Sequence, residues 1–438
     1  MTFRVQKKVL LTTSVFIVAF FLYLLNFDSI ANLFFISGIF FISYSSITYP
    51  ELLVVGLIII ETQLFGVGTP KVFGVLPEKL EIIIFIFSYG LWARNSFKKR
   101  NQIPKSYLLL LYTVFIIFSG SVMACITIRQ SFIIGILLQT RLIVLLSIFP
   151  IISLMNNDEM SYTRLWILIK KIALFQAFIN ILQFFIYPQI QFLSITSENL
   201  RFGSIRITYG FVLIAIALMM SFSELMRKVD KKNIFYSLLY IFELLFVCKT
   251  RMVIFGVLIS IFVAFVLSLK NQDAWRRALL ICFCVLAITP VILPRVSELF
   301  NLTQQEVSTN SGNYVARVGE VEFYTSQVNN PIFGRGYISP KTAGGEALDT
   351  KYGFYSLTDI GIFALYVING ITGLIWFFIL IVILLNRIKK TRYSIFAIEY
   401  LVYTIVTSVT LMGPYFSPEY LILGLTLLSV PKTSNECA

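Results

Sequence analysis

The sequence predicts an all-α, polytopic integral membrane protein, and three observations lead to this fold class. Hydrophobic residues make up 58% of the 438 residues and charged residues only 13%, whereas ordinary globular proteins carry about 25% charged residues. The mean hydropathy is +0.84. Apolar runs of about 17–25 residues, the length of a membrane-spanning helix, recur from one end of the chain to the other. We therefore expect a single polytopic membrane domain over residues 1–438.

We expect about fourteen membrane helices, because each apolar run is long enough, or nearly so, to cross the hydrocarbon core. In the first half of the chain they cover residues 9–25, 30–47, 52–66, 80–92, 107–126, 132–154 and 165–187. In the second half they cover residues 208–225, 234–247, 252–269, 278–293, 358–385, 395–412 and 420–430. The third, fourth and last runs are short for a full crossing.

The basic residues alternate along the chain and predict the topology. Clusters of lysine and arginine precede the first helix or follow an even-numbered one, at residues 4–8, 94–105, 164–171, 227–232, 270–277 and 387–392. Because positive charge marks the cytoplasmic side, both termini should be cytoplasmic. Topology and attraction to anionic membrane lipid then explain the net charge of +14, and we expect no nucleic-acid partner.

Several kinds of chemistry are excluded by what the sequence lacks. The chain contains no histidine, which excludes histidine-based acid–base catalysis and imidazole metal sites. Its five cysteines form neither a disulfide framework nor a zinc motif. There is no Gly-x-x-x-x-Gly-Lys loop of an ATPase, and no Asp-x-Asp motif or paired-acid cluster that resembles a magnesium site. We therefore expect no cofactor and no metal.

Two polar segments should lie on the outer side of the membrane, at residues 188–207 and 294–357. The second is long, and long ordered loops are usually functional. Within it we expect an amphipathic helix over residues 313–327. Its apolar stripe should be formed by Tyr314, Val318, Val321 and Val328. A neighbouring face should carry Arg317, Glu320 and Tyr324. Pro331 should stop this helix, and Gly334-Arg335-Gly336 should form a tight turn.

Charged residues inside or beside the spans are the main functional candidates, because a charge at membrane depth costs about 2.5–3.5 kcal/mol. Arg141 lies near the middle of the sixth run, Arg251 lies in a short turn between two spans, and Asp359 begins the span after the long loop. The alternative for Arg251 and the neighbouring Lys249 is that they only snorkel to the interface. For Glu61 and Glu243, a structural pairing with an arginine is the simpler interpretation.

Arginines gather on the predicted outer side, and they suggest a phosphate ligand. They are Arg201, Arg206, Arg251, Arg317 and Arg335, with Arg141 deeper in the membrane. Guanidinium groups stay ionised and bind phosphate oxygens through a planar fork of donors. Arginines rather than a metal would then stabilise a departing lipid diphosphate. A carboxylate could accept the proton of an attacking hydroxyl, and Asp359 is the best placed, with Glu320 and Glu198 in reserve.

The chain resembles the O-antigen polymerase and ligase superfamily, the Wzy-like membrane glycosyltransferases of bacteria. The resemblance covers most of the second half and lies in the order of several short motifs. They are Arg201-Phe202-Gly203, Lys249-Thr250-Arg251, Arg317-Val318-Gly319-Glu320 and Pro331-Ile332-Phe333-Gly334-Arg335-Gly336. Polymerases of this family carry an arginine and a more distant glycine in the outer loop. Here Arg317 and Gly334 hold those places with one extra residue between them.

One departure separates the two branches of that superfamily. Ligases carry a histidine upstream of a glycine motif, and Gly370-Ile371-Thr372-Gly373 fits the end of their pattern. Counting back, Asp359 occupies the place of the histidine and is followed by Ile360 rather than by a polar residue. The chain therefore resembles the polymerases more than the ligases.

The resemblance implies a metal-independent polysaccharide polymerase in the bacterial cytoplasmic (inner) membrane. Such an enzyme transfers oligosaccharide repeat units between undecaprenyl-diphosphate carriers on the outer side, for capsule or O-antigen biosynthesis. A chain-length regulator and a flippase are the expected partners. Arg141, Arg251 and Arg201 would hold the diphosphate, with Arg206 beside them. Arg317, Glu320 and Arg335 would position glycan or phosphate, and Asp359 would be the base.

Three other interpretations remain open. A flippase for lipid-linked oligosaccharides, or another polysaccharide transporter, would also be basic, polytopic and free of ATPase motifs. An O-antigen-ligase-type enzyme would attach finished glycan to another acceptor. A structural protein of the cell envelope would explain the spans but not the charge of Arg141 at membrane depth.

Overall fold

The computed structural model describes residues 2–68, 71–96, 107–156, 159–195, 200–201, 204–268, 312–339 and 357–430, together with the single positions 297, 301, 304, 308 and 342. Regular structure in these ranges is helical, apart from the two-residue strands β1 (Leu200–Arg201) and β2 (Ser204–Ile205), which pair antiparallel. The predicted all-α class is therefore confirmed for the described part of the chain. The helix expected at residues 278–293 lies outside it.

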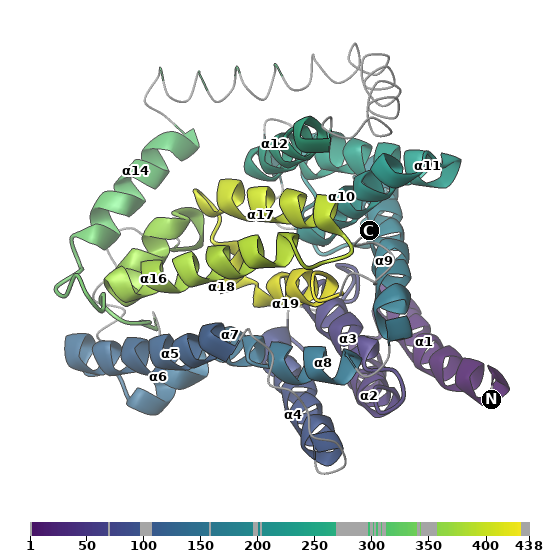
Figure 1. Ribbon diagram of the computed structural model, residues 1–438, viewed down its shortest axis with the longest axis horizontal. Helices are drawn as coiled ribbons and strands as arrows, with labels where there is room; N and C mark the ends of the chain where they lie inside the picture. The colour runs from purple at the N-terminus through teal and green to yellow at the C-terminus, as the bar shows by residue number, and fades with distance from the viewer. Residues whose placement is uncertain are drawn as a thin grey trace.

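The other predicted helices are present with shifted ends (Figure 1). The first half contains α1 (Thr2–Leu24), α2 (Asp28–Ser45), α3 (Glu51–Glu61), α4 (Pro77–Ser96), α5 (Tyr107–Ile128), α6 (Phe132–Leu138), α7 (Thr140–Leu145), α8 (Ile148–Met155) and α9 (Glu159–Ile186). Next come α10 (Phe211–Arg227), α11 (Lys231–Phe242), the π-helix η2 (Glu243–Cys248), α12 (Arg251–Ser268) and α14 (Gly312–Thr325). The chain continues with the 3₁₀-helix η3 (Leu357–Asp359), α16 (Ile362–Ile388), α17 (Ser394–Ser408), α18 (Gly413–Phe416) and α19 (Pro418–Leu427).

Within the described ranges, four helices are long and apolar enough to cross a membrane. They are α2, residues 108–128 of α5, residues 160–186 of α9, and α16. A fifth crossing results if α6 and the following helical segment, bent by 63°, are counted as one broken span. Length and composition therefore support a membrane protein, while the number of about fourteen spans stays a prediction.

Two apolar runs that were expected to form continuous helices are interrupted, so that expectation was wrong. The run at 132–154 breaks at Gln139, whose side-chain amide donates hydrogen bonds to the Ile117 and Gly135 carbonyls at 3.0 and 3.1 Å. The run at 358–385 becomes α16, which contains a non-helical Gly370 with φ 61°. Hydropathy does not register such breaks, because they depend on polar contacts with other helices rather than on local apolarity.

Three segments predicted to be cytoplasmic meet at one end of the helix bundle: residues 164–171, 227–232 and 387–392. The Arg227 guanidinium donates to the Arg392 carbonyl. Trp166 stacks on Tyr393 with 4.1 Å between ring centroids. The spatial grouping of these basic segments agrees with the alternation that the sequence shows.

Helices α12 and α17 run antiparallel. The first turns of α12 and the last turns of α17 therefore lie together, at the end of the bundle opposite the basic segments. Gly256 of α12 lies against Thr407 near the end of α17. Ile261 and Ile395 pack into one small cluster further along the same helix pair. The beginning of α12 therefore lies beside the end of α17, far from the basic segments (Figure 1).

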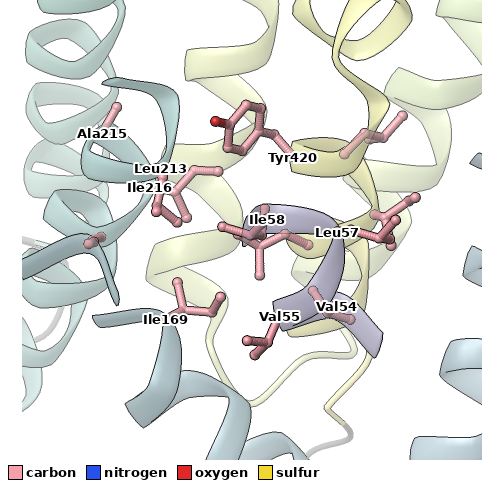
Figure 2. Packing of buried hydrophobic residues seen from close by; sticks show 14 of the residues in the cluster. Val54, Val55, Leu57, Ile58, Ile169, Leu213, Ala215, Ile216 and Tyr420 are labelled. Atoms are coloured by element: carbon pink, nitrogen blue, oxygen red, sulfur yellow. The ribbon is translucent and has the colours of Figure 1, made fainter. Parts of the chain in front are cut away.

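The apolar core joins helices that are distant in sequence. Ile58 of α3, Ile169 of α9, Leu213 and Ile216 of α10, and Tyr420 of α19 converge there (Figure 2). Burying these side chains against one another fixes α3 beside α19. That contact brings the end of α3 near the beginning of α19, where the charged residues described next are found.

Candidate functional site

Arg141, near the beginning of α7, lies among carboxylates rather than among other arginines. Its Nη2 is 3.4 Å from Glu61 Oε2 and 3.3 Å from Glu78 Oε2. Its Nη1 donates a 2.5 Å hydrogen bond to the Phe416 carbonyl and a weaker one of 3.4 Å to Ser417 Oγ. Arg141 therefore joins the end of α3, the beginning of α4 and the junction between α18 and α19.

Two further glutamates complete this group, which we call the acid cluster: Glu61, Glu78, Glu81 and Glu419. One carboxylate oxygen from each of Glu61, Glu81 and Glu419 lies within 4.8 Å of the other two. Glu81 and Glu419 are fully buried. Lys79 lies at its edge and donates hydrogen bonds to the Leu137 carbonyl and to Thr140 Oγ1 across the α6–α7 break.

The acid cluster corrects the expectation that the chain has no paired-acid cluster. Glu61, Glu78 and Glu81 lie close together in sequence, but Glu419 follows more than three hundred residues later, so no local motif contains the whole cluster. The one available signal was a glutamate in each of three apolar segments. The expected pairing of Glu61 with an arginine is confirmed. The same expectation for Glu243 was wrong, because its Oε1 accepts a 2.8 Å hydrogen bond from Asn180 Nδ2 instead.

The segment before α10 and the turn before α12 meet in a cationic group, which comprises Arg206, Lys249 and Arg251. Arg206 Nε donates to the Cys248 carbonyl at 3.2 Å, and its Nη2 donates to Thr250 Oγ1 at 2.9 Å. Lys249 adopts φ 54° and its Nζ donates to the Ile205 carbonyl at 3.2 Å. Arg251, the first residue of α12, is half-buried. Segments that lie more than forty residues apart in sequence thus place three cations at one end of the bundle.

The amphipathic helix predicted in the long loop is present as α14, but its buried face is rotated. Tyr324 is only 3% exposed and packs with Val321 against the beginning of α16. Val318, expected in the apolar stripe, is 40% exposed. Tyr324, which the sequence placed on a neighbouring face, packs against Ile360, Ala364 and Val367 instead. Figure 1 shows α14 beside α16 at the edge of the molecule.

The two predicted loop residues on the buried side of α14 are packed into the protein. Glu320 is 3% exposed. Arg335 is equally buried, and its guanidinium lies 4.8 Å from the centre of the Tyr324 ring and donates to Gln327 Oε1. Arg317 is half-buried. Arg335 is therefore a positioning element for α14, and its predicted role in binding glycan or phosphate stays a prediction.

The segment after α14 inserts into the break of α16. The Arg335 and Gly336 amides donate to the Val367 and Ile368 carbonyls at 2.8 and 2.9 Å. In return, the backbone amides of residues 371 and 372 donate to the carbonyls of residues 331 and 332 at 2.9 and 3.1 Å. Gly334 has φ 71°, and a Cβ at that position would lie 2.5 Å from the Ile368 carbonyl oxygen. The loop thus satisfies the backbone groups that the break in α16 leaves unpaired.

This inserted segment also approaches Arg141. The Tyr337 amide donates to the Gly120 carbonyl of α5 at 3.3 Å. Burial raises the pKa of the Tyr337 phenol, the nearby Arg141 opposes this rise, and Glu78 adds to it. The long loop and the acid cluster are therefore within electrostatic range of each other.

Asp359 ends η3 and is exposed. Two residues later, a Cβ on Gly361 would lie 2.3 Å from the Val409 carbonyl oxygen, so this segment packs on the end of α17. Asp359 consequently lies at the same end of the bundle as Arg251.

Two further predicted residues belong to the segment before α10. The Arg201 backbone pairs with Ser204 in the two-stranded sheet of β1 and β2, and Glu198 lies outside the described residues.

No family model, curated protein or solved structure matches this chain. Two charged groups within the described ranges contain residues that the sequence predicted for the site. One is the cationic group with Asp359 at the same end, and the other is Arg141 within the acid cluster.

Proposed function

We propose that this chain is a membrane glycosyltransferase that polymerises oligosaccharide repeat units carried on undecaprenyl diphosphate, for a capsule or O-antigen-type polysaccharide. The reaction takes place on the outer side of the bacterial cytoplasmic membrane. The lipid and the polymer class come from the resemblance of the sequence motifs. The cationic group of Arg206, Lys249 and Arg251, at the same end as Asp359, is the observation that supports the site.

In this proposal the cationic group holds the diphosphate of the donor. Arg206 and Lys249 are fixed by backbone carbonyls, so their charges are positioned before the lipid binds. Preorganised cations stabilise the negative charge that develops as the diphosphate leaves, without reorganisation at the moment of reaction. Arg251 stands at the beginning of an 18-residue helix, whose dipole adds to the attraction for an anion.

The acceptor is a sugar hydroxyl of the second repeat unit. Its oxygen attacks the anomeric carbon of the donor glycan, the glycosyl–phosphate bond breaks, and the lipid diphosphate departs with the bonding electron pair. Asp359 accepts the hydroxyl proton, a contribution worth typically about 10²–10⁴-fold in rate. Its exposure at the bundle end leaves room for a glycan.

The test is a comparison of polymer length in producing cells. Arg251→Ala and Asp359→Ala, at wild-type protein level, should abolish long polymer while lipid-linked single repeats accumulate. Lys231→Ala is the matched control, because Lys231 is an exposed cation at the beginning of α11. Wild-type length distributions in both site variants would refute the assignment.

A lipid-linked oligosaccharide flippase, or another polysaccharide transporter, is the second candidate. It is favoured by the acid cluster and by the breaks in α6–α7 and α16, because transporters often place buried charges beside discontinuous helices. A transporter would move lipid-linked repeats across proteoliposomes and would form no new glycosidic bond. Polymer made by the purified protein in detergent would therefore exclude this candidate as the sole activity.

A further inference from the structure

Glu81 and Glu419 lie close to each other, and neither forms an ion pair among the described residues. Both residues are fully buried, and none of their four carboxylate oxygens has a hydrogen-bond partner among the described residues. One oxygen of each lies within 4.8 Å of the other and of a Glu61 oxygen. Two buried acids without a donor form a different feature from the ion pairs of Arg141, which already satisfy Glu61 and Glu78.

The surroundings of this pair carry too little positive charge. The charged and titratable groups around it are Glu61 of α3, Glu78 and Lys79 of α4, Arg141 of α7 and Tyr420 of α19, with Tyr337 beyond Arg141. Within the described ranges the cations are thus Arg141 and Lys79, against the four carboxylates of the acid cluster. Full ionisation would leave excess negative charge around two fully buried side chains, and a buried carboxylate in that position takes up a proton instead.

We infer that Glu81 and Glu419 form a proton-binding pair, in which one protonated carboxyl donates its hydrogen to the ionised partner. One proton is enough to give both residues a hydrogen bond and to remove one negative charge. A proton suits the geometry better than a metal ion, because the Arg141 guanidinium already supplies a positive charge 3.4 Å from the third carboxylate. The inference does not depend on the proposed glycosyltransferase activity.

The bound proton has a route to the surface. The side chains of Arg141 and Glu78 are 32% and 28% exposed, and that of Glu61 is 15% exposed. These residues lie between the buried pair and solvent, on the side where Tyr337 of the inserted loop is found.

The proton bound by Glu81 and Glu419 affects the contact between α7 and the junction of α18 and α19. Arg141 bonds the Phe416 carbonyl and Ser417 Oγ, immediately before Glu419. When the proton leaves, Glu419 becomes fully negative and competes with Glu61 and Glu78 for the Arg141 guanidinium. Proton release therefore changes the charge beside the contact through which Arg141 joins α7 to the junction of α18 and α19.

The test is infrared difference spectroscopy of the purified protein at neutral pH, where a protonated carboxyl has a C=O band that a carboxylate lacks. Glu81→Gln and Glu419→Gln should each remove one such band, and the double variant should remove no more than either single variant. Glu51→Gln is the matched control, because Glu51 is buried but paired with Arg164, and it should leave the band unchanged. Additive losses, or no loss in either single variant, would overturn the shared proton.

A second measurement keeps the pair intact. Glu243 and Glu399 are also buried, and each has a carboxylate oxygen without a hydrogen-bond partner within the described ranges, so each would add a carboxyl band if protonated. The variant with Gln at both positions should retain the carboxyl band that Glu81→Gln removes. Disappearance of every carboxyl band in that variant, or binding of one equivalent of Mg²⁺ or Mn²⁺ that Glu81→Gln abolishes, would overturn the inference.

Discussion

At the scale of single residues, the partners predicted for Arg141 were wrong, although the need for a partner was recognised. Its depth in an apolar run marked it as unusual, because a charge there needs a partner or water. The sequence placed it with the other arginines around a diphosphate, whereas the structure pairs it with Glu61 and Glu78. Which residues contact Arg141 depends on how α3, α4 and α19 pack against one another. The sequence alone does not give the distances between these helices.

Replacing Arg141 should destabilise the protein. Arg141→Ala leaves Glu61 and Glu78 without their cation. We expect the free energy of unfolding to fall by about 3 kcal/mol. This is the low end of the cost of breaking a buried ion pair, because the Arg141 side chain is 32% exposed. Thermal unfolding in detergent measures the effect.

A charge-balance control distinguishes repulsion within the acid cluster from simple loss of packing. Adding Glu61→Gln and Glu78→Gln to Arg141→Ala should recover part of the lost stability, because it removes the uncompensated charges. An Arg141→Ala variant as stable as the wild type would contradict the ion-pair account.

At the scale of elements, the insertion of residues 331–336 into the break of α16 connects the long polar loop to a candidate membrane helix. Four backbone hydrogen bonds between residues 331–336 and 367–372 close the break in α16. Gly370 allows this, since its φ is 61° and a Cβ there would lie 2.5 Å from the Ile332 carbonyl oxygen. The sequence predicted the turn at Gly334 but not its docking, because backbone hydrogen bonds between distant segments leave no local pattern.

Gly370→Ala should release the inserted loop. The left-handed backbone is strained for alanine by about 1–3 kcal/mol, and the new methyl group also collides with the backbone of Ile332. We expect a lower unfolding temperature and faster proteolysis between α14 and α16. Gly90→Ala is the control, because Gly90 lies in α4 with open space around it, and alanine there should be neutral or stabilising. Equal protease sensitivity of both variants would contradict the docking.

At the scale of the whole molecule, the sequence predicted more of the arrangement than of the site. Helical spacing and length gave the class and most helices, and the alternation of basic clusters agrees with the grouping of residues 164–171, 227–232 and 387–392 at one end. Apolar runs and basic clusters are properties of short stretches of sequence, so they can be recognised without knowing the fold. The acid cluster and the breaks at Gln139 and Gly370 arise from contacts between helices, and so they appear only in the fold.

The predicted orientation can be tested by cysteine accessibility in intact cells, in a background without the native cysteines. Asp359→Cys should react with a membrane-impermeant thiol reagent from outside. Lys390→Cys, also exposed but at the basic end, should react only after the membrane is permeabilised. Labelling of both positions from the same side would contradict the assignment of the two ends.

The most direct test of the account is polymerisation by the purified chain. Synthetic undecaprenyl-diphosphate-linked repeat units are added to the protein in detergent, and product length is measured on a gel. The account predicts a ladder of longer glycans that Arg251→Ala and Asp359→Ala abolish and that Lys231→Ala leaves unchanged. A purified, folded wild-type protein that leaves the repeat units as monomers, or a ladder that survives in both site variants, would contradict it.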